Sequence, residues 1–343
     1  MTDAFAASGA PAPRRVLITG IAGFTGRHLA RAVLEAGGMV FGVVRGESKS
    51  ALTELAGSID LLTTDLLDRE QTLAMVENVR PDVVFHLATT GGGAGTALPL
   101  ETLRIADNIL TATARLATRR RVKVLVVGSA AEYGLARDRG QLNEDAPLAP
   151  LTPYGVAKMA EVALARRYWL CGMLDVFVAR TFNLIGPGQS TRFVCGSVAQ
   201  QIAAIEHGEQ EPVIRLGQLA SVRDFVDVRD AVRAYEAIVD RGTPGEIYNV
   251  CSGIGTSIEA AVARLVQLAS TPLRVSVDLD RGDVADVTTC VGDRGKIRSA
   301  VGWEPRIALD ESLRDLLSYW RARYGTRIQE AQMSVAAHAV RSA

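Results

Sequence analysis

The sequence predicts an α/β protein, with a doubly wound parallel sheet followed by a smaller C-terminal α/β lobe that holds the substrate. Strand-like apolar runs alternate with amphipathic helical runs, which is typical of such a sheet. Near the chain start, the apolar run 16–18 is followed by Gly20, Gly23 and Gly26, where a tight turn must lead into a closely packed helix. After about Asn183 the elements become shorter and are broken by Gly and Pro. We expect that region to cover a ligand rather than to continue the sheet.

The first half of the chain is expected to hold six strands with helices between them. The predicted strands are Arg15 to Thr19, Met39 to Val44, Ile59 to Thr63, Val83 to Leu87, Val122 to Val127 and Leu174 to Ala179. The first helix should run from about Phe24 to Ala36, because two glycines then end it. Another helix should follow Asp68, a good N-cap, and end before Pro81.

Composition narrows the functional classes. The chain has 343 residues, of which 48% are hydrophobic, so it can bury a large core. Lys plus Arg equals Asp plus Glu at 38 each, so no basic excess indicates a nucleic-acid or anionic-membrane partner. The four cysteines lie far apart without a Cys-x-x-Cys pair, which argues against disulfides and a zinc site. Because no apolar run could span a membrane and residues 1–13 do not resemble a signal peptide, we expect a cytoplasmic, metal-free protein.

The glycine turn predicts a dinucleotide site. Amides at the start of the following helix, at Phe24, Thr25 and Gly26, lack helical partners and can bind a pyrophosphate. NAD-binding proteins usually carry an acid after the second strand, whereas this chain has Arg45 there. A guanidinium can pair with a 2′-phosphate, although a solvated surface arginine would give the same sequence. The sequence therefore favours NADP(H), with NAD(H) as the alternative.

Two further strand ends are expected to contact this cofactor. Asp65 and Leu66 follow the third strand, where the adenine edge would lie, and Leu87 and Ala88 follow the fourth, where the cofactor would cross. His86 has no carboxylate or second histidine near it in the sequence. We therefore interpret His86 as a structural residue rather than as an acid, base or ligand.

The chemistry is predicted by Tyr154 and Lys158, which lie four residues apart on one face of a helix. An ammonium beside a phenol favours the phenolate form, so the pair can donate or accept a proton. Ser129 follows a buried strand and could hydrogen-bond the same substrate oxygen. Tyr-x-x-x-Lys alone is common by chance, but here a glycine turn and a serine at a strand end accompany it.

At this point the chain resembles the extended short-chain dehydrogenase/reductase family, in its nucleotide-sugar branch, over roughly residues 14–323. The matching motifs are the glycine turn, Asp65-Leu66, His86-Leu87-Ala88, the segment Ser129 to Gly134, Tyr154-x-x-x-Lys158 and Arg180-Thr181-Phe182-Asn183. Asn108 lies two positions beyond the place where the family usually has an asparagine, so we assign it no role. The glycine-rich stretch Thr89 to Thr96 is also unusual for the family.

The resemblance implies a Rossmann domain, at residues 14–182, and a substrate lobe at 183–328 from which some chain returns to that domain. Residues 1–13 and 329–343 would be tails. In such enzymes Tyr154 exchanges the proton, Lys158 holds the nicotinamide ribose, and Ser129 binds the substrate oxygen. The family also implies a homodimer formed through two helices per subunit, here about Leu100 to Ala117 and Pro153 to Leu170.

Within the branch, segments 180–190, 211–234, 248–253 and 302–306 most resemble reductases of GDP-4-keto-6-deoxy-D-mannose, which make GDP-D-rhamnose. This resemblance implies that Asn183, Gln189, Arg223 and Arg281 bind the nucleotide-diphosphate sugar. An amide and guanidinium forks suit a diphosphate, although an ion pair with Asp224 is an alternative role for Arg223. The segment around Arg281 departs from the reductase pattern and is more like that of sugar epimerases, which leaves the nucleotide and the reaction open.

Three other functions must be weighed. Sugar 4,6-dehydratases of this family carry an acid pair after the catalytic serine or threonine, but this chain has Ala130 and Ala131, and Glu132 should point differently. An NAD-dependent 4-epimerase needs only Ser129, Tyr154 and Lys158, but Arg45 argues against it. A non-catalytic NADP-binding sensor would not need the intact Tyr-x-x-x-Lys motif.

Overall fold

The computed structural model describes residues 12–46, 48–90, 100–134, 140–217, 219, 221–277 and 289–341, with residues 48–51 and 327–341 described by their backbone alone. Among these residues no helix is both long and apolar enough to cross a membrane.

The described part of the chain contains a parallel seven-stranded sheet in the order β10-β6-β5-β4-β1-β2-β3. Apolar, β-branched runs form most of its strands, which are buried on both faces as expected for a parallel sheet, whereas the edge strand β3 is partly exposed. The strands are β1 (Arg15–Thr19), β2 (Met39–Val44), β3 (Asp60–Thr63), β4 (Val83–His86), β5 (Lys123–Ser129), β6 (Asp175–Thr181) and β10 (Ile247–Val250). The order reverses between β1 and β4, and such a switch point is where ligands bind in open α/β sheets.

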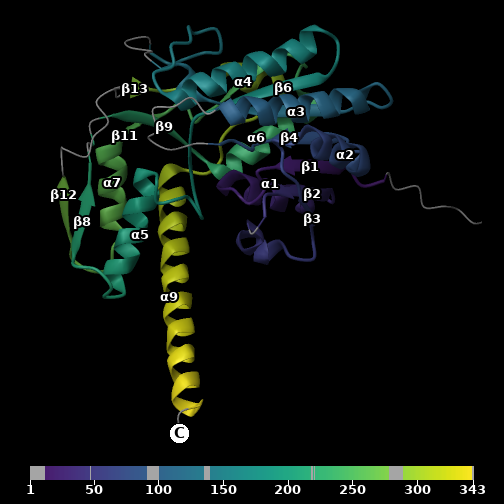
Figure 1. Ribbon diagram of the computed structural model, residues 1–343. Coiled ribbons are helices and arrows are strands. Elements are labelled where there is room, and N and C mark those ends of the chain that lie inside the picture. Colours follow the sequence, from purple (N-terminus) through teal and green to yellow (C-terminus); the bar gives the residue numbers. More distant parts are fainter. Residues whose placement is uncertain are drawn as a thin grey trace, which may run out of the picture.

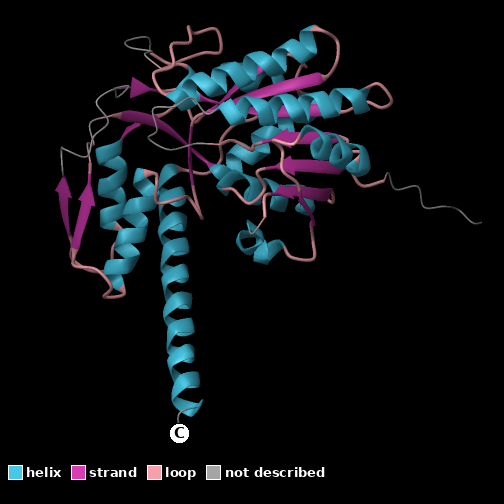
Figure 2. Ribbon diagram, in the orientation of Figure 1, coloured by secondary structure: helices cyan, strands magenta, loops and turns pink. Residues whose placement is uncertain are grey.

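Helices cover both faces of this sheet (Figures 1 and 2). One core cluster joins the sheet to α1 (Phe24–Glu35), α6 (Val228–Arg241) and α8 (Gly295–Val301). The other joins it to α2 (Arg69–Val79), α3 (Leu100–Ala117) and α4 (Pro153–Leu170), of which α3 and α4 lie side by side. Short 3-10 helices, η1 (Ser48–Leu55) and η2 (Ala130–Glu132), follow β2 and β5. The predicted doubly wound fold class is therefore confirmed.

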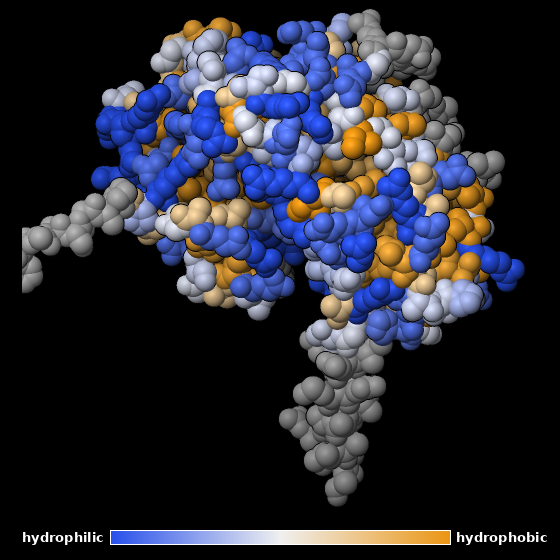
Figure 3. Space-filling view, turned by 180° about the vertical axis from the view of Figure 1, so that it is seen from behind, coloured by the Kyte–Doolittle hydropathy of each residue, from blue (hydrophilic) through white to orange (hydrophobic). Residues whose placement is uncertain are grey.

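The C-terminal lobe has a separate core formed by α5 (Val194–Glu206), α7 (Ile258–Gln267) and the first part of α9 (Leu309–Arg341). Its strands form two small sheets. One contains β7 (Asn183–Ile185), β9 (Val222–Asp227), β11 (Gly255–Ser257) and β13 (Thr289–Cys290), and the other pairs β8 (Val213–Leu216) with β12 (Arg274–Val277). Hydrophilic residues cover much of the face in Figure 3, interrupted by small apolar patches.

The boundaries of the six predicted strands agree with the structure to within one or two residues, whereas β10 of the large sheet and the short strands of the C-terminal lobe were not predicted. The expectation that the chain after Asn183 covers a ligand rather than continuing the sheet was wrong for β10, which pairs in parallel with β6 at the sheet edge. Its four residues follow a Gly- and Pro-containing turn and give too short an apolar run to stand out. The segment 329–341, predicted as a tail, continues helix α9.

Candidate functional site

The turn after β1 has the geometry of a cradle for a phosphate. Gly20 adopts a φ of +71°, and a Cβ there would lie 2.9 Å from the backbone nitrogen of Ala88. A Cβ on Gly26 would lie 2.4 Å from the carbonyl oxygen of Gly20. Helix α1 then begins at Phe24 with no side-chain cap, because its N-cap is Gly23. The free amides of its first turn suit a pyrophosphate, as the sequence predicts.

The predicted adenosine side of the site lies at the ends of β2 and β3. Arg45 is exposed and directly follows β2. Asp65 is exposed, and its Oδ1 accepts a hydrogen bond from the Leu67 amide at 3.0 Å, which shapes the turn. The side chain of Asn108 donates to the carbonyl oxygen of Leu66 at 2.8 Å. The sequence gave Asn108 no role, yet it fixes the turn that carries Asp65 and Leu66.

The predicted catalytic residues converge at the carboxyl end of β5. Ser129 is the last residue of this strand, and its Oγ accepts the Ala131 amide at 3.2 Å. Helix α4, which begins at Pro153 after the N-cap Thr152, packs directly on η2: a Cβ on Gly155 would lie 2.5 Å from the carbonyl oxygen of Ala131. The first turn of α4, which carries the half-buried Tyr154, is therefore held against the turn that follows Ser129.

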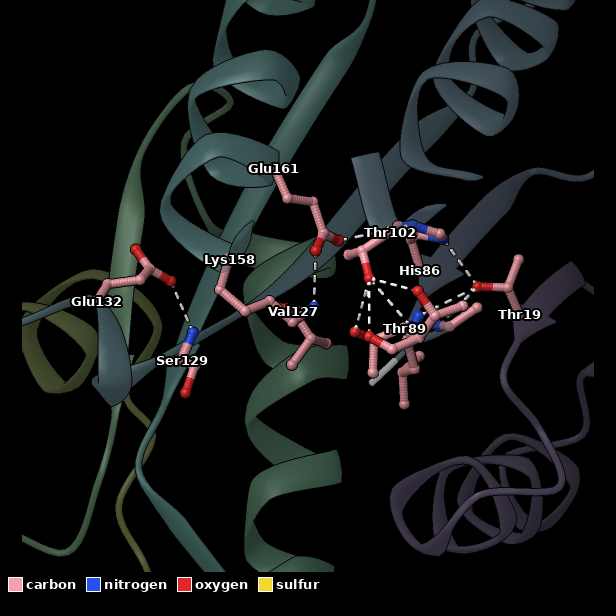
Figure 4. Close-up of polar contacts among 12 residues, drawn as sticks. Thr19, His86, Thr89, Thr102, Val127, Ser129, Glu132, Lys158 and Glu161 are labelled. Carbon is pink, nitrogen blue, oxygen red and sulfur yellow. Dashed lines mark hydrogen bonds and ion pairs between the residues drawn. The ribbon is translucent and has the colours of Figure 1, made fainter. Parts of the chain in front are cut away.

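Lys158 is 3% exposed and lies deeper in the same site. Its Nζ donates to the carbonyl oxygen of Val127 at 2.9 Å and to Glu161 Oε2 at 2.8 Å (Figure 4). Burial by itself lowers the pKa of this ammonium, but the charges of Glu161 and Tyr154 more than offset it, so the pKa lies above its ordinary value. An ammonium has three donors, so one remains for a ligand after these two bonds.

His86 has no carboxylate near it in the sequence, but the fold brings one beside it. His86 Nε2 lies 3.6 Å from Glu161 Oε1, with both side chains fully buried. On the other side of the ring, Nδ1 lies 2.8 Å from Thr19 Oγ1. Burial, and then the charge of Lys158, lower the His86 pKa to about 3, so the ring is neutral. No sequence signal could have placed Glu161 here, because β4 and α4 are far apart in the chain.

Glu132, the acid nearest to the dehydratase positions, is part of a buried structural ion pair. Its Oε1 accepts the Ser129 amide at 2.7 Å and its Oε2 accepts Arg180 Nε at 3.0 Å. Both charged side chains are at most 1% exposed. Arg180 also donates to the hydroxyl of Tyr133 at 3.1 Å. Because both of its oxygens are used and buried, Glu132 is not placed to act as an acid on a ligand.

The predicted substrate-binding residues are less uniformly placed. Asn183 begins β7 and donates from Nδ2 to the carbonyl oxygen of Asp224 at 3.1 Å. Gln189 is 3% exposed and donates to the carbonyl oxygen of Leu184 at 2.6 Å, which indicates a loop-holding residue rather than a ligand contact. Arg223 is half-buried on β9 and donates to the carbonyl oxygen of Val222 at 3.0 Å. Arg281 and residues 91–99 of the glycine-rich stretch lie outside the described residues.

The carboxylate of Asp224 organises the lobe next to these residues. It accepts hydrogen bonds from the amides of Ser252 at 2.7 Å, Gly253 at 2.8 Å and Gly292 at 3.2 Å, and from the Ser252 hydroxyl at 2.6 Å. One buried acid therefore ties β9 to the segments that follow β10 and β13.

Comparison with known proteins identifies the family. A family model described as GDP-mannose 4,6 dehydratase matches residues 17–316. The chain belongs to this family. It is 32% identical to the GDP-6-deoxy-D-mannose reductase of Pseudomonas aeruginosa, over 90% of this chain and 98% of that protein. Among solved structures, RMD from P. aeruginosa complexed with NADPH is similar with a TM-score of 0.74 and 31% identity, over 90% of this chain and 99% of that one.

A second solved structure shows how wide the family is. A putative epimerase from Burkholderia cenocepacia is 34% identical, with a TM-score of 0.78, over 90% of this chain and 99% of that one. The predicted membership of the nucleotide-sugar branch of the extended short-chain dehydrogenases/reductases is confirmed. The choice between reactions within the family rests on the site itself.

Proposed function

We propose that this protein reduces the C4 ketone of a nucleotide-activated 4-keto-6-deoxyhexose with NADPH, with GDP-4-keto-6-deoxy-D-mannose as substrate and GDP-D-rhamnose as product. The observation that carries the proposal is the meeting of Ser129, the first turn of α4 and Lys158 at the end of β5. Among the described residues that follow Ser129, Ala130 and Ala131 stand where the dehydratases carry their acid pair. The reductase similarity over 98% of the P. aeruginosa protein supports the same reaction.

The residues of this chain fit the reduced dinucleotide. The Gly20–Gly26 turn can hold its pyrophosphate, Arg45 its 2′-phosphate, and the segments at Asp65–Leu66 and Leu87–Ala88 its adenine and central parts. Lys158 keeps one donor for the nicotinamide ribose. When bound, NADPH supplies the hydride for C4.

The protein's own part in the reaction is to place a proton and to stabilise the charge that develops on the ketone oxygen. Tyr154 donates its phenolic proton to that oxygen. Ser129 is a second donor, because its Oγ accepts the Ala131 amide and keeps its own hydrogen for the substrate. Asn183, Arg223 and Arg281 would bind the diphosphate.

The dehydratase reaction named by the family description is disfavoured by the site. Ala130 and Ala131 stand where the acid pair would be, and Glu132 is bound to Arg180. A 4-epimerase remains the second candidate because it would use the same three catalytic residues. Arg45 favours the reductase, since an exchangeable NADP(H) suits net reduction.

A substrate panel tests the proposal. NADPH consumption is followed with 4-keto-6-deoxy sugars carrying GDP, dTDP, UDP or CDP. Oxidation with the GDP sugar, and D-rhamnose as its sugar product, would support it. No oxidation with any of them, together with interconversion of unmodified hexose nucleotides, would select the epimerase.

We also propose a homodimer formed through α3 and α4, as in the family. These helices pack side by side on the same face of the sheet (Figure 1). Between them, the Tyr168 hydroxyl is hydrogen-bonded to the Thr111 hydroxyl at 2.8 Å and to Asp107 at 3.0 Å. Sedimentation equilibrium would test this: the mass of two chains is expected, and that of one chain would refute it.

A further inference from the structure

A chain of buried polar groups runs from beneath the catalytic lysine to the loop after β4, and nothing in the proposed mechanism uses it. We call it the Thr19–His86–Glu161 chain. Figure 4 shows Glu161 between Lys158 and His86, with Thr19 on the far side of the ring. Its members come from β1, β4 and α4, and all three are 0% exposed.

The hydrogen bonds of Thr19 assign the proton on His86. Thr19 Oγ1 accepts the amide hydrogens of Leu87 at 3.2 Å and Ala88 at 3.1 Å. Its own hydrogen is therefore left for His86 Nδ1, 2.8 Å away, so that Nδ1 is the acceptor. The neutral ring then carries its proton on Nε2, which faces Glu161 Oε1 at 3.6 Å.

Glu161 is thus held from two sides. Its Oε2 accepts Lys158 Nζ at 2.8 Å, and its Oε1 faces the imidazole N–H. Among the described residues, neither this Oε1 nor His86 Nε2 has a hydrogen-bond partner. The imidazole N–H and the carboxylate oxygen can therefore interact only with each other. Buried ion pairs contribute little net stability, because desolvation offsets the attraction. What this arrangement does supply is a fixed position for the ammonium.

We propose that Glu161 is a positioning residue of the reaction. Held by His86 and Thr19, Glu161 fixes the Lys158 ammonium near Tyr154 and links it to Leu87 and Ala88, where the cofactor would pass. The kinetic consequences of this inference rest on the proposed function, whereas the expected change in the Lys158 pKa does not.

The other ionisable groups that face this pair are already engaged. Glu132 of η2 is paired with Arg180 of β6 at 3.0 Å. Tyr235 of α6 lies 2.9 Å from the Thr181 hydroxyl, and burial raises its pKa above the ordinary value. Tyr154, on α4 itself, is the remaining neighbour of Lys158. Removing the charge of Glu161 should therefore be felt mainly by Lys158.

The first test follows Lys158 directly in the protein without cofactor. The chain has four lysines, Lys49, Lys123, Lys158 and Lys296, so the ¹³Cε signals of labelled lysine can be assigned by substitution. In Glu161→Gln the burial of Lys158 remains and its counter-charge is lost, so the pKa of Lys158 should fall below its value in the wild type. An unchanged Lys158 titration would overturn the inference, whether or not the protein reduces a ketone.

Asp230→Asn is the matched control. Asp230 is a 0% exposed carboxylate on α6 that pairs with Arg233 and accepts the amides of Arg306 and Ile307 at 2.8 Å. Its loss should lower stability but leave the titration of Lys158 unchanged. If Asp230→Asn moved Lys158 as far as Glu161→Gln does, the effect would be general and the inference wrong.

The second test is kinetic. Glu161→Gln should lower kcat by about 10- to 100-fold, a part of the roughly 10²–10⁴-fold that acid–base catalysis contributes, and should shift the pH profile of kcat. Glu161 touches neither ligand, and the Gly20–Gly26 turn and Arg45 would hold most of the cofactor, so the Kd for NADPH should change much less than kcat. Glu161→Asp, which keeps the charge, should recover part of kcat. A KM effect alone, or an unshifted pH profile, would contradict a positioning role.

If Glu161→Gln does not fold, His86→Gln provides the same test. It keeps the Glu161 charge but removes the ring that holds it. We expect a lower kcat with NADPH binding preserved, and wild-type kcat in a folded variant would overturn the inference.

Discussion

His86 should make the free energy of unfolding fall in mild acid. In the folded protein its pKa is about 3, because burial and then the charge of Lys158 disfavour the imidazolium, whereas its ordinary value is 6.5. A folded-state pKa below that of the unfolded chain means that the unfolded state binds the proton first. The stability is therefore complete above pH 6.5 and is lost as the pH falls towards 3.

The size of the loss follows from the same two values. At pH 5, about 1.5 units below the ordinary histidine pKa, protonation stabilises the unfolded chain by roughly 2 kcal/mol. By pH 3 this would reach roughly 4 kcal/mol, which is comparable with the whole stability of many domains. His86→Gln lacks the titrating ring, so it should lose about 2 kcal/mol less than the wild type between pH 7.5 and pH 5.

Urea unfolding at the two pH values measures this difference, because all other titrating groups are common to both proteins. Equal pH dependence in the wild type and His86→Gln would refute the neutral, buried imidazole.

Three further substitutions test other parts of the account. Gly155→Ala would place a Cβ 2.5 Å from the Ala131 carbonyl oxygen and displace Tyr154, so kcat/KM should fall by at least about tenfold. Gly325→Ala is the control: it has open space around it and should leave kcat/KM unchanged. Arg180→Met leaves the Glu132 carboxylate buried without its ion-pair partner and should cost about 3–5 kcal/mol in a urea titration; a change under about 1 kcal/mol would contradict this. Arg45→Ala should weaken NADPH by about tenfold and NADH much less, whereas equal losses by fluorescence titration would argue for NAD(H).

Local patterns in the sequence predicted the parts of the site that are local in the chain. The turn at Gly20, Gly23 and Gly26 needs only a strand, three glycines and a helix, and the geometry at Gly20 and Gly26 is what the spacing indicates. Tyr154 and Lys158 share a helix face because four residues make about one turn. The end of β5 at Ser129 followed from an apolar run, to within two residues.

The contacts that cross the fold could not be predicted in this way. Glu161 meets His86 only because α4 packs on the sheet, and Asn108 reaches the Asp65 turn only because α3 lies against α2. The amide of Gln189 is suited to bind a ligand, yet the side chain is buried and donates to the carbonyl oxygen of Leu184 in its own loop. Such pairings depend on tertiary packing, which no single stretch of sequence records.

The central claim, that Tyr154 donates the proton in a reduction by NADPH, is tested most directly by a single-turnover measurement of Tyr154→Phe. With the enzyme saturated by NADPH and then mixed with GDP-4-keto-6-deoxy-D-mannose, the account predicts a rate of NADPH oxidation lower by roughly 10²–10⁴-fold, with an unchanged Kd for NADPH. A wild-type rate in this variant would contradict it.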